Sequence, residues 1–82
     1  AFAKADNEQQ LLAAGDSLFL QRQFRDAAYF YRYVDDRRRR AECAQACLSA
    51  GDYKEAKMLY EVLGDREMLG FLRENFERSE GI

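Results

Sequence analysis

Hydrophobic side chains recur along this chain at intervals of three and four residues, which is the spacing of one face of an α-helix. Leu11, Ala14 and Leu18 follow this spacing in the first such segment. Few β-branched residues interrupt the pattern, and proline is absent. The pattern therefore predicts an all-α protein with helices at residues 8–21, 24–34, 38–49, 53–63 and 66–78.

Short polar residues and glycines mark the ends of these predicted helices. Asn7, Asp36 and Asp65 stand just before helices, where a short side chain accepts hydrogen bonds from free N–H groups of the first turn. Gly51 and Gly64 follow the third and fourth helices, where a left-handed backbone is easiest without a Cβ. We therefore predict N-caps at the three polar residues and left-handed turns at the two glycines.

The pattern repeats itself along the chain with a fixed period of about 29 residues, a size typical of stacked helical repeats. At this offset the matching pairs are Phe24 with Tyr53, Ala27 with Ala56, and Tyr31 with Tyr60. Neighbouring units of such a stack bury each other's apolar faces, with the small alanines where two helices cross closely. We predict one domain over 1–82, with repeat one at 7–35, repeat two at 36–64 and a capping helix at 65–78.

The residues at these repeated positions resemble the tetratricopeptide repeat. In repeat one they are Leu11, Ala14, Gly15, Leu18, Phe24, Ala27 and Tyr31, and in repeat two Cys43, Ala44, Cys47, Gly51, Asp52, Tyr53, Ala56 and Tyr60. The resemblance implies an α-solenoid of antiparallel helix pairs, with two hairpins and a C-terminal capping helix. The chain departs from the family in its shorter period, since the family repeats at about 34 residues, and in lacking the proline after the second helix.

The resemblance also implies a groove, lined by the first helix of each pair, that binds a peptide or amphipathic helix of a partner protein. The partner-binding residues implied in this groove are Leu12, Asp16, Phe19, Arg38, Gln45 and Leu48. Family members that clamp a peptide's C-terminal carboxylate have Lys and Asn where Leu12 and Asp16 stand here. We therefore expect a mixed apolar and polar groove that does not use this clamp.

A second candidate surface lies on the predicted helix 24–34, which is apolar around much of its circumference. Tyr29, Phe30 and Tyr33 cannot all face the same way on a helix. Such a helix is either buried against both flanking helices or covered by a partner. These three aromatic residues are therefore either packing residues or an exposed patch that binds a protein or self-associates.

Four consecutive arginines, Arg37 to Arg40, form the most pronounced run of charge. Consecutive helical residues point about 100° apart, so these side chains surround the helix and form no stripe. Asp35 and Asp36 partly neutralise them. We expect local ion pairs, with Arg40 laying its stem on the core and pairing with Glu42 or Glu61, and regard a phosphate-binding patch as the alternative.

Composition narrows the range of functions. Histidine is absent and the net charge is −2, which removes the usual general base and gives no overall attraction to nucleic acid. The two cysteines, Cys43 and Cys47, lie one helical turn apart and fit small buried core residues of a cytoplasmic protein. We expect no enzyme, cofactor, metal site or membrane segment.

The sequence thus favours a protein-interaction module, adaptor or scaffold. One alternative is an oligomerisation or structural segment of a larger α-solenoid. The other is nucleic-acid binding through Arg37–Arg40, which the acidic balance of the chain disfavours.

Overall fold

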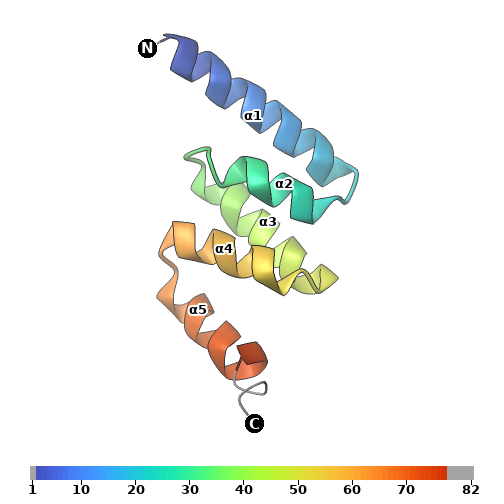
Figure 1. The fold of residues 1–82 in the computed structure, drawn as a ribbon, viewed down its shortest axis with the longest axis vertical. Coiled ribbons are helices and arrows are strands. Elements are labelled where there is room, and N and C mark those ends of the chain that lie inside the picture. Colours follow the sequence, from blue (N-terminus) through green and yellow to red (C-terminus); the bar gives the residue numbers. More distant parts are fainter. Residues whose placement is uncertain (1, 78–82) are drawn as a thin grey trace.

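Helices make up almost all of the chain that is described. The structure is a computed structural model, and it describes the backbone of residues 2–77 and the side chains of residues 7–76. Its elements are α1 (Phe2–Leu20), α2 (Phe24–Tyr31), α3 (Arg37–Ala50), α4 (Tyr53–Leu63), α5 (Arg66–Leu72) and a π-helical turn η1 (Arg73–Glu77) (Figure 1). No strand occurs within residues 2–77, and the predicted all-α class is confirmed for them.

The helices follow one another along the long axis of a molecule that measures 50 × 26 × 17 Å. The most extensive contacts join α3 to α4 and α1 to α2, and α2 also packs on α3 and α4. α1 and α5 lie at opposite ends (Figure 1). Each helix is thus supported mainly by its neighbours in sequence.

Two predicted helix boundaries are wrong by three residues or more, and three others differ by one residue. The predicted helix 66–78 is α-helical only to Leu72 and continues as the π-helical turn η1. α1 begins at Phe2, so Asn7 lies inside the helix and is not its N-cap. Residues 3–5 are Ala-Lys-Ala, which favour helix, so nothing in the local sequence stops the helix at residue 7. α2 ends at Tyr31, before the predicted end at residue 34, and the chain continues as a turn. The last residue of the predicted capping helix, residue 78, lies outside the described residues.

The other predicted caps and turns are confirmed. Asp36 accepts a hydrogen bond from the backbone N–H of Arg39 at 3.0 Å, and Asp65 accepts one from the N–H of Met68 at 3.1 Å. Gly51 and Gly64 have φ of 87° and 71°, which is the left-handed region. These residues set the turns that separate α3, α4 and α5.

Arg22, which stands 29 residues before Gly51 in the sequence, also has a positive φ, of 63°. A left-handed backbone costs a residue with a Cβ roughly 1–2 kcal/mol. The chain therefore adopts a left-handed turn after α1, as it does after α3, even though the sequence supplies no glycine there.

The core consists mainly of small residues and tyrosines from α2, α3 and α4. The buried hydrophobic residues are Ala27, Ala28, Tyr31, Val34, Cys43, Ala44, Cys47, Ala56, Leu59, Tyr60, Leu63 and Leu72. Ala27 and Ala56 are both fully buried, in agreement with the close helix contacts expected at these two positions. The small side chains allow neighbouring backbones to approach, and the tyrosines fill the space between successive helices.

Candidate functional site

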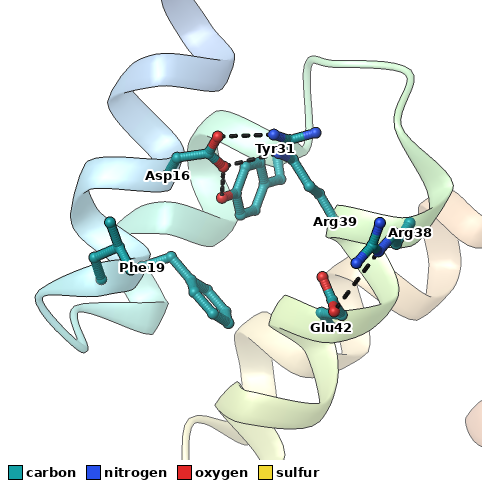
Figure 2. Close-up of a pocket in the computed structure, with 7 residues that line it drawn as sticks. Asp16, Phe19, Tyr31, Arg38, Arg39 and Glu42 are labelled. Carbon is teal, nitrogen blue, oxygen red and sulfur yellow. Dashed lines mark hydrogen bonds and ion pairs between the residues drawn. The ribbon is translucent and has the colours of Figure 1, made fainter.

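A hollow of about 350 Å³ opens between the C-terminal half of α1 and the N-terminal half of α3 (Figure 2). The residues that line it are Asp16, Phe19, Leu20, Tyr31, Arg38, Arg39 and Glu42. We call it the α1–α3 pocket. Three of the six groove residues inferred from the resemblance, Asp16, Phe19 and Arg38, therefore meet in one place.

One wall of the α1–α3 pocket is a network of polar side chains from three helices. The Asp16 carboxylate of α1 accepts hydrogen bonds from Nε of Arg39 at 2.8 Å and from Nη2 at 2.9 Å. The hydroxyl of Tyr31 in α2 donates to the same carboxylate, and Nη1 of Arg39 donates to Asp36 at 2.9 Å. Figure 2 shows Asp16, Tyr31 and Arg39 converging from their separate helices. Bidentate pairing of this kind fixes the direction of both groups.

The network sets the protonation states of its members. The hydrogen bonds from the Arg39 side chain hold the pKa of Asp16 below its usual value. The backbone N–H of Arg39, and then its guanidinium, do the same for the pKa of Asp36. Burial, followed by the bond to Asp16, raises the pKa of the Tyr31 hydroxyl. At neutral pH the wall is therefore a fixed arrangement of ionised carboxylates, a guanidinium and a neutral phenol.

Acid should weaken the fold through this network. Because the pKa values of Asp16 and Asp36 are lower in the folded than in the unfolded chain, their contribution is complete above about pH 4, the ordinary value for aspartate. It is lost as the pH falls through the lowered values, since the unfolded state then binds more protons. We expect the melting temperature to fall between about pH 5 and pH 2, and Asp16→Asn to reduce that fall.

Asp26→Asn, which removes an exposed carboxylate from α2, is the matched control for this measurement. Thermal melts followed by circular dichroism across the pH range provide the comparison. An equal reduction of the pH dependence by both variants would contradict a special role for Asp16.

The other side of the pocket is apolar. The ring of Phe19 packs edge-to-face on that of Phe24, with centroids 5.1 Å apart. Leu20, the last residue of α1, is 84% exposed. The resemblance implied Phe19 but not Leu20, although Leu20 is a large apolar residue one position before the predicted helix end at residue 21. Together the two residues offer an apolar surface to an incoming side chain.

One exposed and weakly interacting ion pair lies at the rim of the pocket. Arg38 and Glu42 lie one turn apart on α3, with 3.9 Å between Arg38 Nε and Glu42 Oε2, and their side chains are 87% and 57% exposed. Exposed pairs of this kind contribute little to stability. Both side chains can therefore change partners without a large cost to the fold.

Two other arginines of the run Arg37–Arg40 form hydrogen bonds with the C-terminal ends of neighbouring helices. Arg37 donates to the carbonyl of Leu63 at the end of α4 at 3.3 Å. Arg40 donates to the carbonyls of Tyr31 and Arg32 at the end of α2, at 2.9 and 3.0 Å. The C-terminus of a helix is its negative end, so both placements are favourable.

The sequence suggested that Arg40 pairs with Glu42 or Glu61, and this expectation is wrong. Its head group is taken up by the carbonyls of α2, and the nearest carboxylate oxygen, of Asp35, is 4.0 Å from it. Its side chain is only 11% exposed, which agrees with the expected burial of its stem. Arg40 thus donates hydrogen bonds to carbonyl groups at the C-terminal end of α2, which stabilises the end of the helix at this point.

The remaining predicted partner-binding residues lie outside the α1–α3 pocket. Leu12 and Leu48 are partly buried against the core, and Gln45 is exposed on α3. On the second candidate surface, Phe30 is partly buried on α2, whereas Tyr29 and Tyr33 are 40% and 66% exposed. The nine predicted residues therefore form no single surface.

The two cysteines lie in the core, as expected. Cys43 and Cys47 are fully buried, and the sulfur of each lies 3.4 Å from the carbonyl oxygen of Phe24. The hydrogen bond with Cys43, and then burial, raise the pKa of the Cys47 thiol. The Cys47 thiol therefore remains protonated and poorly reactive at neutral pH.

Other kinds of site are not found in the described part of the chain. No group of three or more potential metal-ligating side chains occurs among its residues. None of the helices in this part combines the length and the apolar character that crossing a membrane requires.

Comparison of the chain with protein-family models, with curated proteins and with solved structures yields no match to any of them. The resemblance to the tetratricopeptide repeat therefore stays a hypothesis that the repeated positions alone support.

Proposed function

We propose that the protein is a binding module that docks a peptide or helix of a partner protein in the α1–α3 pocket. The observation that carries the proposal is the exposed Leu20 beside Phe19, at the edge of a hollow with a rigid polar wall. Burying a leucine side chain contributes about 1.5–3 kcal/mol. An apolar anchor of the partner, seated on these two residues, would supply most of the affinity.

The polar wall and the rim have separate parts in this proposal. The network of Asp16, Tyr31 and Arg39 is already formed, so binding does not have to order it. Arg38 and Glu42 are exposed and paired only loosely, which lets them exchange partners with charges that flank the anchor. They would set the orientation of the bound segment more than its affinity.

We further propose that the helices form a short α-solenoid of two helix pairs and a capping helix. Support comes from the repeat register, which matches buried Ala27 with buried Ala56 and buried Tyr31 with buried Tyr60. The extensive contacts of α1 with α2 and of α3 with α4 fit two such pairs. In this architecture the α1–α3 pocket lies between the first helices of the two units.

The arginine run lends little support to nucleic-acid binding. Arg37, Arg39 and Arg40 are engaged with other parts of the fold. The side chain of Arg38, 87% exposed, extends into solvent beside Glu42. Docking of a protein segment is therefore the function that the geometry favours.

A random peptide display library, selected on the immobilised protein, tests the proposal. Selected peptides should share a large apolar residue and should lose at least about tenfold in affinity for Leu20→Glu, because a buried charge opposes an apolar anchor. Phe71→Glu is the matched control, since Phe71 is also an exposed apolar helix residue and lies far along the chain. Equal losses in both variants, or no enrichment of apolar peptides, would refute docking in this pocket.

A further inference from the structure

The outward faces of α2 and α4 carry a second concentration of functional groups. Arg25 and Tyr29 on α2 and Arg32, the helical-conformation residue directly after it, stand four and three residues apart, so they share one face of the helix. In the repeat register, Lys54 and Met58 occupy on α4 the positions that Arg25 and Tyr29 occupy on α2. Since α2 and α4 pack on each other, the two faces lie side by side.

A hollow of about 450 Å³ lies where these faces meet. Its lining residues are Tyr29, Arg32, Lys54, Lys57, Met58 and Glu61. Arg25 and Lys54 also line a neighbouring depression at the start of α4. We call Arg25, Tyr29, Arg32, Lys54 and Met58 the α2–α4 surface, and it shares no residue with the α1–α3 pocket.

The charge of the α2–α4 surface is opposite to that of the whole chain. Arg25, Arg32 and Lys54 are exposed, and none of them forms an ion pair with any of the side chains at residues 7–76. The chain as a whole has a net charge of −2. A local cluster of cations on an acidic protein favours an acidic partner at short range.

A buried carboxylate fixes the aromatic member of this surface. Tyr29 donates a hydrogen bond to Glu55 at 3.0 Å, and Glu55 is only 6% exposed. The hydrogen bond orients the Tyr29 ring. It also occupies the Glu55 carboxylate, which would otherwise compete with an acidic partner for the nearby cations. Cζ of Arg32 lies over the Tyr33 ring, 5.5 Å from its centroid, which is within the range of a cation–π interaction.

We propose that the α2–α4 surface is a second docking site, which binds an acidic protein segment through Arg25, Arg32 and Lys54. An aromatic or aliphatic side chain of that segment packs against Tyr29 and Met58. The cations supply charge complementarity and speed association, and the two apolar residues supply desolvated contact area.

A protein segment suits this surface better than a nucleic acid. Nucleic-acid binding depends on neutralising many phosphates along an extended path, whereas the cations here are grouped around two neighbouring hollows, one of which also contains Glu61. The overall negative charge of the chain opposes the approach of a long polyanion. A short acidic segment avoids most of that repulsion.

Fluorescence anisotropy with a fluorescein-labelled copolymer of glutamate and tyrosine tests this second site. We expect salt-sensitive binding to the wild-type protein and a loss of about tenfold or more in the double variant Arg25→Glu/Lys54→Glu. Both substitutions fall in the first turn of a helix, where a carboxylate is favoured, so the fold should be retained. Circular dichroism melts verify that it is.

The matched control is Arg66→Glu/Arg73→Glu, which changes the net charge by the same amount on α5 and η1, away from this surface. It should change the affinity by no more than about twofold, as should Leu20→Glu in the α1–α3 pocket. Equal weakening by the two double variants, or no binding of the copolymer at low salt, would overturn the proposal. Tighter binding of a labelled oligothymidylate of equal charge would overturn it too, and would identify a nucleic-acid surface.

Discussion

Gly15→Ala should destabilise the protein by about 1–3 kcal/mol, the usual cost of overpacking a closely packed site. A Cβ on Gly15 would lie 2.7 Å from Cε1 of Tyr31 and 3.1 Å from Cδ1. The Tyr31 ring cannot easily move aside, because it is buried and its hydroxyl is bonded to Asp16. The helix α1 would have to shift away from α2. Urea unfolding of the variant and the wild type measures the difference in free energy.

Gly70→Ala provides a control with the opposite expected sign. Gly70 lies within α5, and a Cβ placed on it meets no atom within 4 Å. Replacing a helical glycine by alanine at an unstrained position stabilises by about 0.5–1 kcal/mol. A stabilising effect of both substitutions would contradict the close approach of α1 to Tyr31.

Tyr31→Phe and Tyr60→Phe should differ in their effects, although the two residues hold matching positions in the predicted repeat. The Tyr31 hydroxyl donates to an ionised carboxylate, and its loss should cost about 1–2 kcal/mol. The Tyr60 hydroxyl is buried and has no hydrogen-bond partner among the described residues. Its removal should be neutral or stabilising by up to about 1 kcal/mol, because no desolvated hydroxyl then remains. Urea unfolding of both variants, which keep the same ring, measures the contrast.

The repeat register explains this contrast. Gln45 stands where Asp16 would be expected in the second unit, and Met68 stands in place of Arg39. The carboxylate and the guanidinium that complete the network around Tyr31 are therefore both absent from the matching positions near Tyr60. Burial is the main cause that raises the pKa of the Tyr60 hydroxyl. Equal destabilisation by the two substitutions would show that the Tyr60 hydroxyl has a partner in solution.

Local signals located most of the helices because they act over a few residues. Asp36 and Asp65 cap the helices that follow them, and Gly51 and Gly64 adopt the left-handed turns. The same reasoning failed at Asn7, where a good capping residue stands in a segment that favours helix on both sides. A capping side chain stabilises a helix start but does not by itself end a preceding helical segment.

The candidate site was harder to predict from the sequence than the helices were, because its residues come from three helices. Asp16, Tyr31 and Arg39 converge only when α1, α2 and α3 are packed. The run Arg37–Arg40 forms one charged feature in the sequence, yet its members reach different helix ends. Tyr29 was identified as a candidate, but its bond to Glu55, 26 residues away, was not.

The sequence by itself determined the helical class and most of the turns, because spacing, propensity and capping are properties of neighbouring residues. The tertiary structure alone decided which charges meet, which hydroxyl is satisfied and where the two hollows open. Those features depend on distances between helices, and pairing across helices is set by how closely small residues such as Gly15 allow the backbones to approach.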